Sequence, residues 1–142
     1  MNKNHIAKAA MLINAPASRV WDAITKPELI KQYLFDTDVI SDWQVGSPIL
    51  YRGEWEGKSF EDKGTILKIE REKQLVSTHW SPLSGVPDTP ENYHTVTYDL
   101  VPNEDKTELT ITQDNNADEQ EKLHSEENWK AVLVGLKKLL EQ

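Results

Sequence analysis

The sequence contains no cysteine, which excludes a whole class of chemistry. Disulfide bonds, thiolate nucleophiles and metal sites with cysteine ligands all need that residue. Arginine is scarce as well, with three residues in the chain, and the formal net charge is −8. A surface that tracks nucleic-acid phosphates needs clustered positive charge, so nucleic acid is not an expected partner.

Long apolar runs are also missing. No stretch approaches the roughly 18 apolar residues that a membrane-spanning helix requires. The first residues, Met1 to Ala15, are too polar and too strand-like for a signal peptide. We therefore expect a soluble, cytoplasmic protein without a membrane span. The length of 142 residues is typical of one domain with its own core, which would span residues 1–142.

The clearest pattern lies at the end of the chain, over residues 118–142. Its apolar residues recur at three- and four-residue spacing, which predicts an amphipathic helix. They are Trp129, Val132, Leu133, Leu136, Leu139 and Leu140. Acidic residues crowd the start and lysines the end, which suits the helix dipole. A helix this long with an apolar stripe must lie against a broad surface.

The rest of the chain predicts such a surface. Residues 5–14 are typical of a strand, and two short helices are expected over 16–26 and 27–34, separated by Lys26-Pro27. From residue 38 to residue 113 the apolar period changes to two, which predicts about six antiparallel strands. Gly64 interrupts one of them, and we expect a bulge there. The predicted fold class is α+β, with a curved sheet of about seven strands around the terminal helix.

The longest irregular segment is residues 81–92, which contains three prolines and a glycine. Long loops in compact domains are often functional, and this one is a candidate lid. If the flanking strands pair symmetrically about it, His79 faces His94 and Trp80 faces Tyr93. Two facing histidines could bind a metal, act as a general base or sense pH, or could simply be hydrogen-bonded. No third ligand is apparent, so no metal site is predicted.

Catalytic constellations are not evident. No motif such as G-x-S-x-G is present, and we predict no catalytic residue and no cofactor. Three acidic pairs, Glu54 with Glu56, Glu61 with Asp62, and Asp118 with Glu119, are interpreted as solvated turn or helix-start residues. General acid–base catalysis would need one of these carboxyl groups to be desolvated.

Aromatic residues are the most informative group, because they are spread over elements that would surround the gap between sheet and helix. Trp21 and Trp129, at helical spacing, are typical of a core. Tyr51, Trp55 and Tyr98, at alternating strand positions, favour the lining of a cavity. The predicted ligand-binding set is Tyr33, Phe35, Trp43, Tyr51, Trp55, Trp80, His94, Tyr98, Trp129 and Leu133.

Several segments resemble one known superfamily. Residues 13–34 read INAPASRVWDAITKPELIKQYL, which combines a strand end, a proline, an apolar–Trp pair and Thr-x-Pro-Glu. This opening resembles that of the helix-grip superfamily called SRPBCC, which includes START lipid-transfer domains, birch-pollen-allergen-like proteins and polyketide cyclases. The later segments WQVGSPILYRGEW, GTILKIEREKQLVSTHW and NWKAVLVGLKKLL are similar to one bacterial branch. That branch resembles the C-terminal domain of the activator of the ninety-kilodalton heat-shock-chaperone ATPase.

The resemblance spans nearly the whole chain, but its motifs specify the fold more than an activity. Many relatives have Trp at the position of Tyr33 or Leu34, and Gly-Gly in place of Gly46-Ser47. What it implies is binding of a small hydrophobic molecule, aromatic or lipid-like, between sheet and helix. A protein–protein module serving a chaperone or a stress response is an alternative. A cyclase- or hydrolase-like enzyme is another, with His94 or Glu54 as its titratable group.

Overall fold

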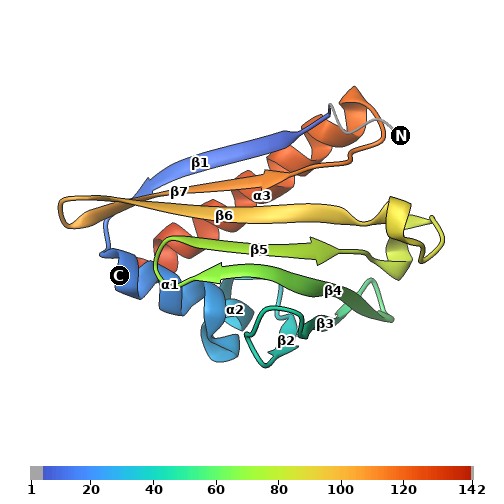
Figure 1. Ribbon diagram of the computed structural model, residues 1–142, viewed down its shortest axis with the longest axis horizontal. Coiled ribbons are helices and arrows are strands. Elements are labelled where there is room, and N and C mark those ends of the chain that lie inside the picture. The colour runs from blue at the N-terminus through green and yellow to red at the C-terminus, as the bar shows by residue number, and fades with distance from the viewer. Residues whose placement is uncertain (1–4, 142) are drawn as a thin grey trace.

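The computed structural model describes residues 5–141 and contains one sheet with helices on one of its sides (Figure 1). The strands are β1 (Ala7–Ile13), β2 (Asp38–Ser41), β3 (Pro48–Trp55), β4 (Lys58–Glu70), β5 (Gln74–His79), β6 (His94–Asn103) and β7 (Lys106–Gln113). The helices are α1 (Ala17–Thr25), α2 (Pro27–Tyr33) and α3 (Glu119–Leu140), with short 3₁₀ turns η1 (Pro82–Ser84) and η2 (Pro90–Asn92).

The sheet has seven strands in the order β1-β7-β6-β5-β4-β3-β2, and every neighbouring pair is antiparallel. The first strand therefore pairs with the last one, while β2 and β3 form the other edge. This arrangement confirms the predicted α+β helix-grip fold. The register also confirms that His79 pairs with His94.

The long helix α3 crosses the inner face of the sheet (Figure 1). Asp118 caps its start by accepting a hydrogen bond from the backbone N–H of Glu121, and lysines occupy its last turn. Its predicted apolar stripe faces the sheet, and Val132, Leu133, Leu136 and Leu140 are buried. The helix packs most closely against β1, and α1 and α2 fill the remaining space at its C-terminal end.

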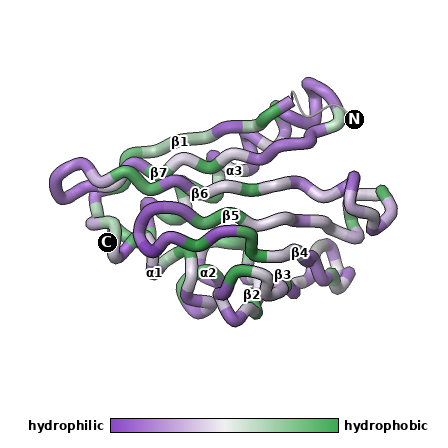
Figure 2. Tube along the Cα trace, viewed as in Figure 1, coloured by the Kyte–Doolittle hydropathy of each residue, from purple (hydrophilic) through white to green (hydrophobic). Residues whose placement is uncertain are grey.

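The core lies between these layers, because buried and exposed residues alternate along strands such as β1 and β7. Figure 2 shows hydrophobic and hydrophilic residues interspersed along the chain. Ile13, Ile66, Leu109 and Ile111 are fully buried on the sheet side. The short helices contribute Val20, Trp21, Ile24 and Ile30. The Tyr33 hydroxyl donates to the Ala23 carbonyl at 2.8 Å, which ties α2 to α1.

One local prediction is wrong. Gly64 lies inside the continuous strand β4, and the shift of register falls between Ile66 and Lys68 instead. The glycine is needed for a different reason: a Cβ built on it would lie 1.7 Å from the Thr78 carbonyl oxygen of β5. It thus allows two backbones to approach more closely than any side chain would permit.

No helix in the described part of the chain is long and apolar enough to cross a membrane.

Candidate functional site

A cavity of about 210 Å³ lies between the sheet and α3. The strands contribute Tyr51 from β3, Phe60 and Asp62 from β4, His79 from β5, Val96 and Tyr98 from β6 and Gln113 from β7. Its other side is formed by Leu34, Phe35 and Thr37 after α2, and by Asn128, Trp129 and Val132 of α3.

The walls of this cavity are largely aromatic. The rings of Tyr98 and Trp129 meet edge to face, with centroids 6.0 Å apart. Phe60 lies over Gly53, where a Cβ would come within 2.7 Å of its ring. The side chain of Phe60 therefore takes its position because its cross-strand partner has no side chain of its own.

One end of the cavity is polar. The Nε2 atom of His79 lies 3.0 Å from Oδ2 of Asp62. The His79 ring meets the Tyr51 ring edge to face, with centroids 5.5 Å apart. The Asp62 side chain is only 16 % exposed. Its second oxygen, Oδ1, is buried, and it is the one buried side-chain oxygen or nitrogen without a hydrogen-bond partner among the described residues.

The tyrosine hydroxyls of the cavity remain protonated under ordinary conditions. Burial raises the pKa of Tyr51 to about 12, although a hydrogen bond with Ser77 acts in the opposite direction. Burial also raises the pKa of Tyr98 well above its usual value. Both residues can therefore offer a neutral O–H group to a bound molecule at neutral pH.

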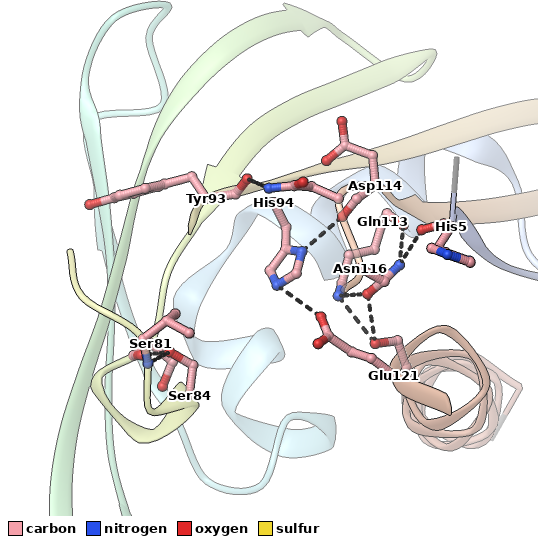
Figure 3. A network of polar contacts seen from close by, with 12 residues as sticks. His5, Ser81, Ser84, Tyr93, His94, Gln113, Asp114, Asn116 and Glu121 are labelled. Atoms are coloured by element: carbon pink, nitrogen blue, oxygen red, sulfur yellow. Dashed lines mark hydrogen bonds and ion pairs between the residues drawn. The ribbon is translucent and has the colours of Figure 1, made fainter. Parts of the chain in front are cut away.

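A hydrogen-bond network joins Trp129 of α3 to the end of β7, and Figure 3 shows its part around Gln113 and Asn116. The Trp129 indole N–H donates to Oε1 of Gln113 at 2.9 Å. The Gln113 amide in turn donates to Oδ1 of Asn116 at 2.9 Å and to the Ser125 hydroxyl at 3.2 Å. Asn116 is fully buried and donates to the His5 carbonyl. These bonds hold Trp129 in one orientation against the cavity.

A wider groove of about 790 Å³ adjoins the cavity, and His79, Gln113 and Asn128 line both. The groove is bordered by residues 81–92 on one side and by the first turns of α3 on the other. His94 lies in it, donating from Nδ1 to the Asp114 carbonyl at 2.8 Å, with Nε2 at 3.7 Å from Glu121 (Figure 3). Residues 81–92 thus border the groove next to the cavity, and their role as a lid stays a prediction.

The structure divides the predicted ligand-binding residues into groups. Phe35, Tyr51, Tyr98 and Trp129 line the cavity. Tyr33 and Trp43 pack against the core, and Leu133 is completely buried within it. Trp80 and His94 line the outer groove. Trp55 ends β3, and its side chain lies outside the part that the structure describes. Contact of any of them with a ligand stays a prediction.

The two facing histidines do not act as one unit. His79 and His94 are paired across β5 and β6, but the first bonds to Asp62 and the second to Asp114. The neighbouring pair of Trp80 and Tyr93 does stack, with ring centroids 6.5 Å apart. Among residues 5–141, no three His, Asp or Glu side chains converge closely enough to hold a metal ion.

The interpretation of Asp62 as a solvated turn residue is wrong, because it lies within β4 and faces inward. The signal was available: Phe60, Asp62 and Gly64 alternate in step with the buried Ile66. Glu54, in contrast, is exposed on β3, outside the cavity. The acid–base pair that lines the cavity is thus Asp62 with His79. The residues predicted for such a role were His94 and Glu54.

Known proteins agree with this architecture. Residues 14–141 match the family described as "Activator of Hsp90 ATPase homolog 1-like protein". The chain belongs to this family. No curated protein matches its sequence.

Solved structures extend the comparison. Protein ChR145 from Cytophaga hutchinsonii is 51% identical with a TM-score of 0.87, and the match covers 99% of this chain and 97% of that one. The Aha1 dimer from Colwellia psychrerythraea is similar at 20% identity and a TM-score of 0.74, with 96% of each chain covered. DynU16, a protein of the dynemicin biosynthetic locus, is 17% identical with a TM-score of 0.81. That match covers 98% of this chain and 48% of DynU16. At these two lower identities the likeness concerns the fold alone.

Proposed function

We propose that the chain binds a small hydrophobic molecule, aromatic in at least part, in the cavity between the sheet and α3. The observation that carries this proposal is the aromatic lining of Phe35, Phe60, Tyr98 and Trp129 around space of about 210 Å³. Cores are normally packed to high density, so unfilled volume of this size bordered by aromatic rings is a suitable ligand site. Burial of apolar ligand surface would supply the driving force.

Two features of the surroundings support this reading. The cavity adjoins the groove bordered by residues 81–92 and shares three lining residues with it, and this groove is the proposed path for entry. One structural neighbour of the same fold, DynU16, comes from the dynemicin biosynthetic locus. We propose no chemical step, because binding alone accounts for the arrangement of the lining residues.

The test is a comparison of two methionine variants on α3. Val132 lines the cavity and Leu136 is equally buried on the same helix, but does not line it. Val132→Met should extend into the cavity and occupy it, whereas Leu136→Met exchanges two side chains of similar volume. The protein would be examined by native mass spectrometry and by thermal shift with indole and toluene.

Ligands that bind only the folded state raise its unfolding temperature. We expect such a shift for the unchanged protein and for Leu136→Met, and its loss in Val132→Met. Equal shifts in all three proteins would argue against the cavity as the binding site. No bound mass and no shift with any aromatic probe would contradict ligand binding itself.

A second candidate, recognition of a protein partner of the co-chaperone type, has one observation in its favour. The outer face of the sheet carries a groove of about 640 Å³, whose lining includes Pro48, Leu50, Leu67 and Tyr93. Leu67 is 47% exposed there. Apolar side chains gathered on a surface favour protein contacts. If this face binds a partner, Leu67→Asp should weaken capture of a chaperone or self-association measured by sedimentation, without changing the indole-induced shift.

A further inference from the structure

The polar end of the cavity carries information about the ligand that its apolar walls do not. Asp62 uses only one of its two carboxylate oxygens, because Oδ2 lies 3.0 Å from the His79 ring nitrogen. The Oδ1 atom is buried without a partner among the described residues. A buried acceptor that stays unpaired is unfavourable, and native proteins rarely keep one without a reason. Asp62 itself lines the cavity, so it borders the space that a bound molecule would occupy.

The carboxylate is also held in a defined position. Asp62 pairs directly with Tyr51 across β3 and β4. His79 touches both, through the contact with Oδ2 and the edge-to-face contact with the Tyr51 ring. With Oδ2 oriented by the imidazole, the direction of Oδ1 is fixed before any ligand binds. Because Oδ1 is preorganised as an acceptor, it favours ligands that carry an O–H or N–H donor at one particular position.

The charge of the site excludes other ligand classes. Asp62 and His79 are the acidic and basic side chains among the cavity's lining residues; they are bonded to each other, and neither lysine nor arginine is among them. A fatty-acid carboxylate or a phosphate would bring a negative charge beside Asp62 and find no lysine or arginine to compensate it. Neutral O–H and N–H groups and protonated amines meet no such penalty.

The volume limits the size of the ligand. An engineered apolar cavity of about 150 Å³ holds one benzene molecule. The present cavity of about 210 Å³ therefore suits one substituted ring, with further groups extending into the groove.

We propose that Asp62 is the specificity-determining residue of the cavity, and that its Oδ1 accepts a hydrogen bond from an O–H or N–H group on a single-ring, uncharged or cationic ligand. This inference rests on the proposed ligand-binding function and narrows it to one class: phenols, aromatic amines and their N-heterocyclic analogues.

The experiment compares three para-substituted toluenes: p-cresol, which has an O–H donor, p-xylene, which has nearly the same shape and no donor, and p-toluate, which is an anion. Each is titrated into the protein at pH 7.5, and binding is followed by the NMR signal of the Trp129 indole N–H. We expect p-cresol to bind at least about tenfold more tightly than p-xylene, since a hydrogen bond to a charged acceptor is among the stronger kinds. Binding of p-toluate should be undetectable.

The variant Asp62→Leu removes the acceptor and keeps a similar side-chain volume. It should lose the preference for p-cresol, so that p-cresol and p-xylene bind within about twofold of each other. Glu61→Leu is the matched control, because Glu61 is the adjacent carboxylate and is exposed on the other face of β4. It should keep the preference. Both variants would first be checked for folding by near-ultraviolet circular dichroism.

The outcomes separate the two proposals. Equal affinity of the unchanged protein for p-cresol and p-xylene would overturn the role of Asp62 and leave the binding cavity intact. A preference that survives in Asp62→Leu would do the same. If p-toluate bound more tightly than p-cresol, the assignment of ligand class would be wrong. If none of the probes bound the unchanged protein, the ligand-binding function and this inference would both fail. Should Asp62→Leu not fold, the comparison of probes on the unchanged protein still decides.

Discussion

Gly64 of β4 lies against the backbone of Thr78 of β5, so that a Cβ on the glycine would be 1.7 Å from the Thr78 carbonyl oxygen. On either side of this contact the strands are joined, by the pairing of Ile66 with Ser77 and by the bridge between Lys63 and Trp80. The close approach therefore occurs between two interior strands of the sheet, two residues along β4 from Asp62. It brings β4 and β5 together where His79 reaches the carboxylate.

Replacement of this glycine should be severely destabilising. In Gly64→Ala the methyl group would overlap backbone atoms, which cannot move as a side chain can. We expect the free energy of unfolding to fall by roughly 3 kcal/mol or more, at the upper end of what overpacking costs. Urea denaturation followed by circular dichroism would measure the change.

Gly57→Asn provides the control for that experiment. Gly57 lies in the turn between β3 and β4 with φ of +79°, and nothing lies within 4 Å of a Cβ placed there. Asparagine tolerates this backbone conformation, so the loss should stay below about 1 kcal/mol. A similar loss in both variants would show that strand flexibility, and not the contact with Thr78, accounts for the effect.

Replacement of Asn116 should be equally destabilising, because it would break buried hydrogen bonds. Its amide donates to the carbonyls of His5 and Gln113 at 2.8 and 3.0 Å, and its oxygen accepts from Gln113 and Ser125. Asn116→Ala would leave several buried groups unpaired and should lower the free energy of unfolding by about 3 kcal/mol. Asn128→Ala, at an exposed position of α3, should change it by less than about 0.5 kcal/mol.

The variant Asn116→Ala also tests what holds Trp129 in the wall of the cavity. Asn116 supports Gln113, which orients the Trp129 indole. In Asn116→Ala the tryptophan should become more mobile, which would be seen as a shifted and broadened indole N–H signal in NMR spectra. An unchanged signal would mean that packing against Tyr98 is sufficient to hold the ring.

Much of the fold could be predicted from periodicity alone. The spacing from Trp129 to Leu140 predicted α3, and alternation predicted the strands, because both patterns reflect which face of an element is buried. Symmetry about residues 81–92 was enough to predict the pairing of His79 with His94. These inferences concern residues that are close in the chain or related by one hairpin.

The site was less predictable, since its contacts depend on strand order and curvature. Trp129 can donate a hydrogen bond to Gln113 only because α3 passes over β7, and no local sequence pattern encodes that arrangement. The inward position of Asp62 follows from its alternation with Phe60, Gly64 and Ile66, but Glu61 and Asp62 were interpreted together as a solvated turn. The bond of Asp62 with His79 depends on the neighbouring strand β5, which no local pattern around Asp62 encodes.

Alkaline titration should reveal the buried tyrosines. Burial raises the pKa of Tyr51 to about 12, while an exposed tyrosine in the unfolded chain titrates near 10. Between these pH values the unfolded state has lost the proton and the folded state has kept it. The contribution to stability is therefore complete below pH 10 and is lost as the pH rises towards 12.

The expected loss for Tyr51 is about 3 kcal/mol over that range. In Tyr51→Phe this part of the pH dependence should disappear, which denaturant titrations at pH 9, 10 and 11 would detect. Tyr93→Phe serves for comparison, because burial and the bond to Asp88 also raise the pKa of Tyr93, but less than that of Tyr51, so this variant should lose a smaller part of the pH dependence. The same pH dependence in Tyr51→Phe as in the unchanged protein would show that the Tyr51 hydroxyl is accessible to water.

The outer edge of β1 leads to the last prediction. Strand edges expose unpaired N–H and C=O groups that can pair with another chain. Here α3 covers them: Glu126 accepts from the backbone N–H of Lys8 at 3.0 Å, and Glu141 accepts from that of Asn14 at 2.8 Å. The Lys137 ammonium donates to the Leu12 carbonyl at 3.2 Å and also contacts Glu141, whose pKa it holds below the usual range.

Removal of both carboxylates, in the double variant Glu126→Ala and Glu141→Ala, should expose this edge and increase self-association at least several-fold. Sedimentation velocity over a range of concentrations would measure it. The double variant Glu28→Ala and Glu127→Ala changes the net charge equally at exposed positions away from β1, and it should behave as the unchanged protein does. If both variants associated to the same degree, reduced charge repulsion would explain the effect. If neither did, the packing of α3 against β1 would be sufficient to protect the edge without its carboxylates.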